Sequence, residues 1–384
     1  LDLYACQYMG ENRLYLNRGD GVFDLASDAY GLNFDGASVM MAFADYDCDG
    51  DLDGYLVTSG LPPRPDQKFR VRFEGNKPVV LDELREFWDL LYLPGDKAKQ
   101  IETGQRDRLF RNDVDAQGRP HFVSVAAEAG IEGTDIGQSA TWFDFNDDGL
   151  PDVYVANDYW GPDRLYRNNG DGTFTDIAKQ ALPHTPWSSM GADFADVNGD
   201  GLLDFLATDM AGSNHFRQKV GMGDMASAGW FLEYAEPRQY SRNALYINSG
   251  TERFMEAAFI TGLDSTDWTW TPRFEDFDND GLVDVLITNG MTRDFTNSDL
   301  NDLAKRTAKE GSPEFFEFWR KQGYRKDANV AYRNQGDLHF ENVSRDWGFD
   351  REGVSFGAAT ADLDLDGDLD MIVNNMDTTA LVYR

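Results

Sequence analysis

Short apolar runs recur along the chain, and each follows directly after a run of acidic residues. The apolar runs are 54–58, 153–156, 205–208, 285–288 and 371–374. They are rich in Val, Ile, Leu, Tyr and Phe, and Gly and Asp residues bound them, which is typical of β-strands. The pattern therefore predicts one strand after each acidic segment.

A second pattern follows each of these strands at a variable distance. It consists of a short β-prone run, a turn around Asn-x-Gly-Asp-Gly, and an aromatic residue, most clearly in 13–23 and 164–174. Looser copies lie in 108–122, 244–254 and 331–340. An Asp-Gly pair between two β-prone runs predicts a hairpin. One repeat is thus strand, acidic loop, strand, connector, strand, hairpin and strand.

Repeated four-stranded antiparallel units predict an all-β fold, the β-propeller. The alternative, a β-sandwich, would not carry the same acidic loop at the same place in every unit. Six units are visible in 1–384, so the expected ring has six or seven blades in a single domain. We expect both ends to be cut, because Leu1-Asp2 matches the end of an acidic loop and 381–384 matches a third strand.

The acidic loops share the nine-residue pattern Asp-x-(Asp/Asn)-x-Asp-Gly-x-x-Asp. The five copies are 45–53, 144–152, 196–204, 276–284 and 362–370. Side-chain oxygens at positions 1, 3, 5 and 9, with a main-chain carbonyl at position 7, can converge on a hard cation, and Gly at position 6 permits the sharp turn. About five Ca²⁺ sites are therefore predicted. Mg²⁺ is the weaker candidate because it usually keeps several waters, and ion-free Asp-rich turns are the remaining alternative.

The predicted metal ligands occupy positions 1, 3, 5, 7 and 9 of each loop. They are Asp45, Asp47, Asp49, Asp51, Asp53, Asp144, Asn146, Asp148, Leu150, Asp152, Asp196, Asn198, Asp200, Leu202, Asp204, Asp276, Asp278, Asp280, Leu282, Asp284, Asp362, Asp364, Asp366, Asp368 and Asp370. A helical calcium hand would need Glu at position 12. That position is apolar in every copy, so a helical calcium hand is excluded.

These motifs resemble the FG-GAP/VCBS repeat family, whose best-known members are the integrin α-chain propellers. The match is clearest over 356–370, and the chain is most similar to bacterial repeat proteins related to cartilage acidic protein. The resemblance implies a propeller fold. It implies little about function, because the family includes adhesion proteins, scaffolds and some enzymes.

The formal net charge of −33 excludes the basic face that nucleic-acid binding requires. No run of 18 apolar residues predicts a membrane span. Calcium modules with extracellular affinities work at roughly 0.1–1 mM, far above cytosolic calcium, so we expect a secreted or cell-surface protein. Cys6 and Cys48 are too few for a disulfide framework; they are either inert thiols or a single bridge.

Three long insertions, 59–107, 209–242 and 289–328, fall between the second and third strands of their units. In a four-stranded meander, these connectors lie on the face opposite the acidic loops, so the insertions are predicted to form a cap there. The apolar spacing in 81–92 predicts a helix. Ser298 and Ser312-Pro313 are predicted to begin two more helices.

The connectors between units point to the same face and supply candidate ligand-binding residues. These are His184, Trp187, Asp267, Trp268 and Trp270. Indole rings can stack on sugar rings while carboxylates accept hydrogen bonds from hydroxyls. Equally, the same side chains could pack one blade against the next.

The sequence favours a calcium-binding adhesion or binding module for a protein or glycan. One alternative is a calcium-dependent polysaccharide lyase using His184 or His215 as a general base with Arg217 or Arg273. The other alternative is a structural subunit of a surface assembly. The adhesion-like tripeptide 18–20 is interpreted as hairpin chemistry, because other units carry Asn-Gly-Asp or Gln-Gly-Asp at the same place.

Overall fold

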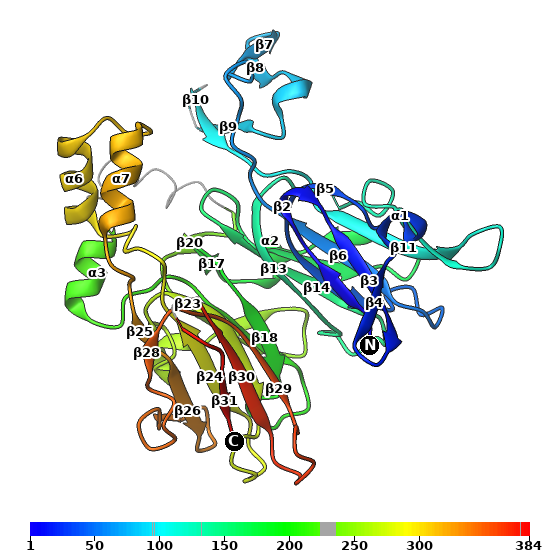
Figure 1. Cartoon of the computed structure of the whole chain (residues 1–384), viewed down its shortest axis with the longest axis vertical. Coiled ribbons are helices and arrows are strands. Elements are labelled where there is room, and N and C mark those ends of the chain that lie inside the picture. The colour runs from blue at the N-terminus through cyan, green and yellow to red at the C-terminus, as the bar shows by residue number, and fades with distance from the viewer. Residues whose placement is uncertain (94, 96, 132, 223–235, 377) are drawn as a thin grey trace. The chain divides into compact units, whose positions relative to one another are not determined.

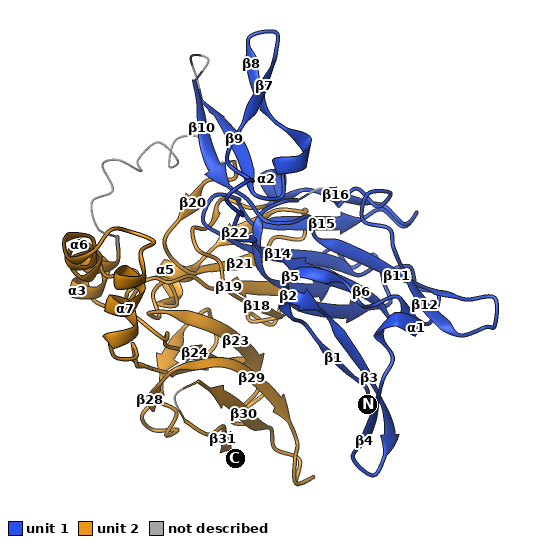
Figure 2. Cartoon of the chain, turned by 45° about the horizontal axis from the view of Figure 1, so that its top comes forward, with its two compact units in different colours: residues 1–181 blue, residues 182–384 orange. Residues whose placement is uncertain are grey.

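The computed structural model describes residues 1–384 except 94, 96, 132, 223–235 and 377. The described chain consists of small antiparallel sheets with a few short helices (Figure 1). It divides into two compact units, Leu1–Ala181 and Leu182–Arg384 (Figure 2). Six of the sheets are propeller blades, three in each unit, so the prediction of an all-β propeller is confirmed with six blades.

Unit 1 holds the first three blades. Their strands, in chain order, are β1 (Leu3–Ala5), β3 (Arg13–Gly19) and β4 (Val22–Leu25); β5 (Asp35–Ala44), β6 (Asp53–Thr58), β11 (Arg108–Val114) and β12 (Pro120–Ser124); and β13 (Ile136–Phe143), β14 (Asp152–Asp158), β15 (Arg164–Asn168) and β16 (Phe174–Asp176). Strand β2 (Tyr8–Glu11) pairs with the free edge of β5. Two one-turn helices, α1 (Ser27–Tyr30) and α2 (Ala178–Ala181), follow the last strands of the first and third blades.

Unit 2 holds the other three blades. Their strands are β18 (Ala192–Ala195), β19 (Asp204–Ala207), β21 (Ala244–Asn248) and β22 (Phe254–Glu256); β23 (Thr269–Glu275), β24 (Asp284–Asn289), β26 (Val330–Asn334) and β27 (Phe340–Asn342); and β29 (Ser355–Ala361), β30 (Asp370–Asn375) and β31 (Leu381–Tyr383). The short helix α5 (Ala258–Thr261) follows β22. Two small sheets pair β17 (Thr185–Pro186) with β20 (Gln239–Tyr240), and β25 (Asp327–Ala328) with β28 (Glu352–Gly353).

In five of the six blades the second strand is a predicted apolar run, and four of these strands, β6, β14, β19 and β24, are buried almost throughout. Tyr55, Val57, Val153 and Val155 from two such strands join one buried cluster of unit 1. Leu206, Val285 and Ile287 have the same role in unit 2. Strands buried on both faces read as continuous apolar runs rather than as alternating ones, which is why these segments stood out in the sequence.

The first insertion is built from two hairpins, so the predicted helix over 81–92 is wrong. The hairpins are β7 (Val71–Glu74) with β8 (Lys77–Val80) and β9 (Trp88–Leu93) with β10 (Lys97–Glu102). Only a single 3₁₀ turn, Asp82–Leu84, lies between them. The pairing of β9 with β10 outweighs the helical spacing of apolar residues in 81–92. It also buries Leu90, which would lie off the apolar face of the predicted helix.

The other two insertions contain helices where the structure describes them; those of the third were predicted, and that of the second was not. The second contains α3 (His215–Met222), and its remaining predicted cap segment at 223–235 lies outside the described residues. The third contains α6 (Ser298–Thr307) and α7 (Pro313–Lys321). Helix α6 contacts both α3 and α7 (Figure 1).

The helix starts in the third insertion match the predictions to within one residue. The Ser312 hydroxyl accepts the N–H of Phe315, and Pro313 takes the first helical position. For α6 the cap is Asn297 rather than Ser298, because the Asn297 amide oxygen accepts the N–H groups of Asp299 and Leu300. No helix among the described residues is long and apolar enough to cross a membrane. Cys6 and Cys48 are free thiols.

Candidate metal centre

Each of the five acidic loops joins the first strand of a blade to the second, and all five have the same backbone turn. The Gly at position 6 has φ between 85° and 99° in every loop, a left-handed conformation that disfavours other residues. Position 4 is also left-handed, at φ 58° to 73°, even where it is Cys48 or Leu365.

The Asp at position 1 shapes the loop through backbone hydrogen bonds. Its two carboxylate oxygens accept the N–H groups of positions 5 and 6, at 2.7–3.2 Å in all five loops. The Asp at position 5 in turn accepts the N–H of position 7, at 2.9–3.2 Å. These bonds fix the carboxylates in place, and the carbonyl role of position 7 stays a prediction.

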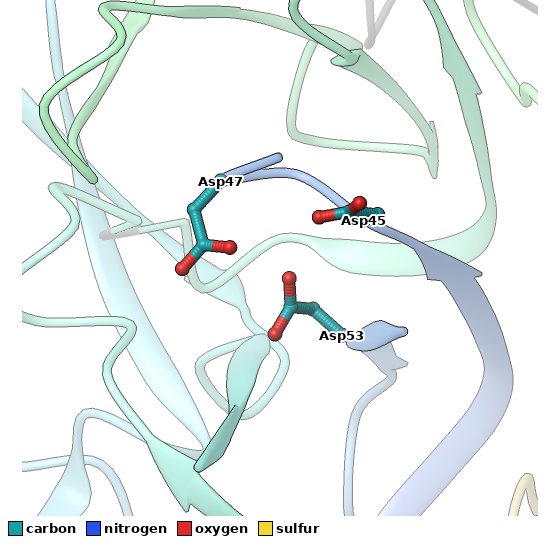
Figure 3. A group of neighbouring side chains, drawn as sticks. All are labelled: Asp45, Asp47 and Asp53. Carbon is teal, nitrogen blue, oxygen red and sulfur yellow. The ribbon is translucent and has the colours of Figure 1, made fainter. Parts of the chain in front are cut away.

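Three loops gather carboxylates closely enough to hold a metal ion. The groups, each with oxygens within 4.8 Å of one another, are Asp45, Asp47 and Asp53; Asp276, Asp278 and Asp280; and Asp362, Asp364 and Asp370. Figure 3 shows the carboxylates of Asp45, Asp47 and Asp53 turned toward a common point. Oxygen atoms in this arrangement are the ligands that hard cations prefer.

The other two loops have Asn at position 3. The amide nitrogens of Asn146 and Asn198 donate to the position-5 carboxylates of Asp148 and Asp200, at 2.9 and 3.0 Å. Basic side chains also reach position 3 in two loops. Arg333 lies 2.8 Å from Asp278, and Arg384 lies 3.1 Å from Asp364.

The Asp at position 9 is the first residue of the second strand and is buried in every loop. One of its oxygens accepts the N–H of position 2 of its own loop, at 2.9–3.3 Å. In four blades the other oxygen accepts the N–H of an Asn at or near the end of the third strand, at 2.7–2.9 Å. Position 9 therefore ties the loop to the third strand as well as facing the loop's other acids.

Burial raises the pKa of these position-9 carboxyls. The pKa rises to about 7 for Asp53, Asp152 and Asp204, and to about 6 for Asp284, against the opposing effect of the backbone N–H groups. Neighbouring loop carboxylates raise it further. A bound cation would offset this accumulation of negative charge.

The sequence-predicted ligand residues all lie in unit 2. His184 is 5% exposed, and its Nε2 lies 2.8 Å from Arg242 Nη2 and 3.4 Å from Glu256 Oε2. The backbone N–H of Trp187 donates to Asp209 at 2.8 Å.

The second group of these residues joins the insertions to the blades. Asp267 accepts hydrogen bonds from the backbone and hydroxyl of Ser213, and Arg325 lies over the buried ring of Trp268. Trp270 donates to the Gly290 carbonyl at 2.6 Å. All of these contacts are made within the protein, and a ligand-binding role for the five residues stays a prediction.

Sequence reasoning missed a polar pocket in unit 1. It has a volume of about 430 Å³, and Arg164, Trp160 and Asp135 are among the residues that line it. Asp135 lies in a connector that the topology points to the predicted cap face. Two residues close together in the sequence could have indicated this pocket. Arg164 begins the third strand of its blade, and Trp160 lies in the connector just before that strand.

Sequence comparisons find one repeat family and two curated relatives. The model of the FG-GAP-like repeat matches residues 1–56 and 144–207. Cartilage acidic protein 1 of Mus musculus is 25% identical over 280 residues, and that of Homo sapiens is 24% identical over 279 residues. Each match covers 71% of this chain but only 35% and 34% of the respective relative, so the chain spans about a third of their length.

Solved structures show a looser likeness. The Agrocybe aegerita lectin described as recognising non-reducing terminal N-acetylglucosamine has a TM-score of 0.40 at 14% identity, covering 97% of this chain and 74% of its own. The V. cholerae biofilm matrix protein Bap1 has a TM-score of 0.37 at 14% identity, covering 97% and 73%. At these TM-scores neither likeness bears on function.

Proposed function

Because the chain carries FG-GAP-like repeats and is homologous to cartilage acidic protein 1, we propose that it is a calcium-stabilised propeller acting outside the cell as a binding module for a protein or glycan. The observation that carries the calcium part is the shared backbone construction of five acidic loops, whose carboxylates are fixed by backbone N–H groups and, in three of the loops, gather within 4.8 Å of one another. Ca²⁺ accepts six to eight oxygen ligands in flexible geometry, which suits these loops better than Mg²⁺ does.

The role proposed for calcium is structural. If free calcium is tenfold above each dissociation constant, an independent site adds about 1.4 kcal/mol to the free energy of unfolding, and five sites add about 7 kcal/mol. That is comparable to the whole stability of an ordinary domain. The extracellular location is proposed because calcium modules with affinities of roughly 0.1–1 mM are filled only where calcium is far above cytosolic levels.

The calcium part is tested by thermal unfolding and by counting bound ions. We expect chelation with EDTA to lower Tm by more than 10 °C, taking about 2–4 °C per kcal/mol for a chain of this size. Excess Ca²⁺ should restore Tm, while Mg²⁺ should restore little of it. Calorimetric titration should count about five calcium ions. A Tm that is the same with calcium and with chelator would contradict the proposal.

The binding part is proposed for the face opposite the loops, where insertions 59–107, 209–242 and 289–328 would form a cap. Its support is that helix α6 contacts both α3 and α7, and that all three helices expose large apolar side chains. Phe216 is 67% exposed, Leu303 is 51% exposed and Phe316 is 64% exposed. Exposed apolar side chains of this size are typical of interaction surfaces when they gather in one patch.

This part is tested with purified extracellular matrix proteins and polysaccharides immobilised on a surface. The Leu303→Ser/Phe316→Ser variant should lose binding while keeping the wild-type Tm, because both side chains face solvent. Lys305→Ser, an exposed change on the same helix α6, is the matched control and should bind normally. Binding to no member of the panel would contradict the proposed function, and so would undiminished binding by the double variant.

A further inference from the structure

The pocket of unit 1 lies at the end of β14 that is remote from its acidic loop. The connector after β14 supplies Trp160 and Gly161, the segment leading into β13 supplies Gly133 and Asp135, and β10 supplies Ile101. Its volume of about 430 Å³ falls within the ~300–1,000 Å³ typical of small-molecule pockets. Strand β10 and two connectors therefore build a site that lies outside the acidic loops.

A fixed ion triad forms one wall of this pocket. Arg164 donates through Nε to Asp135 at 2.9 Å and through Nη1 to Asp176 at 2.9 Å. Its Nη2 lies 2.7 Å from the same Asp135 oxygen. A Cβ at Gly161 would overlap the Asp135 carboxylate, so only Gly leaves room for the triad. The triad offers spare N–H groups and carboxylate oxygens side by side in fixed positions.

The hydroxyl of Tyr166 is the second polar feature of the pocket. Tyr166 is only 3% exposed, and its ring packs in the core of unit 1. The hydroxyl lies within 3.3 Å of where a Cβ on Gly133 would stand, and both residues line the pocket. Within the part of the chain that the structure describes, no group pairs with it. The hydroxyl oxygen is reached from the pocket rather than sealed in the core, so it is available to bond a water or a ligand there.

The charges of the pocket limit what the ligand can be. Four acidic side chains line it against one arginine: Asp89, Glu102, Asp135, Asp176 and Arg164. An anionic ligand would be repelled by this excess of carboxylates. A cationic group would be attracted by it, but the Arg164 guanidinium and Lys99, whose Nζ lies 5.1 Å from the ring centroid of Trp160, both disfavour a cation beside the triad and the indole. A neutral ligand with hydroxyls that both donate and accept matches the spare groups of the triad and of Tyr166.

We propose that this pocket binds a terminal sugar residue of a neutral saccharide. Trp160 and Ile101 supply the apolar surface that the C–H face of a pyranose ring contacts, while Arg164, Asp135 and Tyr166 meet its hydroxyls. The inference rests on the proposed binding function and adds to it the ligand class and a site in unit 1. It uses none of the residues of the acidic loops.

The test uses the calcium-loaded chain and a panel of methyl glycosides of neutral hexoses and N-acetylhexosamines. Methyl glucuronide is the anionic probe, and agmatine is the cationic probe. We expect at least one neutral glycoside to bind with Kd of about 1 mM or tighter, measured by calorimetry and saturation-transfer NMR. Binding of none of the neutral glycosides, or preferential binding of glucuronide or agmatine, would overturn the proposal.

Tyr166→Phe locates the binding. It removes only a hydroxyl that has no protein partner among the described residues, so Tm should stay unchanged or rise while Kd weakens about three- to tenfold. Tyr246→Phe is the matched control, because Tyr246 is the equivalent residue of β21 but donates to the His184 carbonyl at 2.7 Å. That variant should lose stability and keep glycoside affinity.

The outcomes separate the saccharide site from the broader function. A calcium-loaded chain that has a normal Tm, binds matrix components and ignores every glycoside would remove only the saccharide site. Glycoside binding that Tyr166→Phe and Trp160→Ala leave unchanged would place the sugar elsewhere and also overturn the assignment. Loss of all matrix binding with intact glycoside binding would remove the proposed cap surface instead.

Discussion

The side chain of Asn168 provides the sharpest test of how the blades are joined at the loop end. Asn168 ends β15 and is 3% exposed. Its Oδ1 accepts the N–H of Gly170 at 3.0 Å, which closes the hairpin turn. Its Nδ2 donates to the carbonyl of Pro151 at 3.1 Å and to that of Tyr46, in the acidic loop of the preceding blade, at 2.7 Å.

Asn168→Ala removes three hydrogen bonds and leaves their backbone partners without this side chain. At about 1 kcal/mol each, the free energy of unfolding should fall by about 3 kcal/mol. Asn169→Ala is the neighbouring control, because its side chain is exposed and bonds only to Thr173 and Thr175 of the same hairpin. Its cost should stay below about 0.5 kcal/mol.

The measurement is equilibrium unfolding by urea with calcium present, comparing midpoints at equal slope. Equal losses for the two variants would refute the reasoning, because the hairpin turn alone would then account for both. A large loss confined to Asn168→Ala would show that the link to the preceding blade carries the stability. Calcium counting on both variants checks that the acidic loops are otherwise intact.

Three further predictions concern a loop, a buried acid and a helix cap. Asp280→Asn, which alters one acidic cluster, should lower the calcium count by one, whereas the exposed Asp302→Asn should not. Burial raises the pKa of Asp107 to about 7, so the stability due to its bound proton is lost as pH rises from about 4 to about 7. The urea midpoint of Asp107→Asn should therefore fall less steeply over this pH range than that of the wild type, and an equally steep fall would contradict this. Ser312→Ala should cost about 1 kcal/mol by losing the cap of α7, and Ser298→Ala, which caps nothing, should cost less.

The blades could be predicted because each element has a local signal. The acidic loop requires Gly at a left-handed position, and the strand after it is buried on both sides, so both leave a pattern in consecutive residues. The Asn-x-Gly hairpin is equally local, since Asn168 closes its own turn onto Gly170. Five acidic loops and four Asn-x-Gly hairpins mark the repeats along the chain without any knowledge of distant contacts.

The first insertion could not be predicted correctly because its strands depend on a partner. The spacing of apolar residues in 81–92 fits a helix, but β9 pairs with β10 along its whole length. The pocket of unit 1 was missed for a similar reason. Neither the position of the Tyr166 hydroxyl nor the bond from Arg164 to Asp135 is visible in consecutive residues.

The predicted ligand residues illustrate the same limit from the other side. His184 and Trp268 were singled out because aromatic side chains in connectors often face ligands. In the structure, arginines from distant segments reach them: Arg242 hydrogen-bonds His184, and Arg325 lies over Trp268. Composition of a connector indicates which chemistry is present, and the contacts decide how much of it is already used within the protein.

The hydrogen bonds of the acidic loops also indicate what a cation would do there. In each loop the position-1 carboxylate already accepts two backbone N–H groups, and the position-9 carboxylate accepts at least one more. These bonds close the turn through the backbone of the loop itself. What these bonds leave partly uncompensated is the burial of the position-9 carboxyl and the repulsion among three to five carboxylates; both raise the pKa of Asp53, burial the more strongly. A cation at this site would act mainly by offsetting charge, so its removal should cost stability far more than it changes the fold.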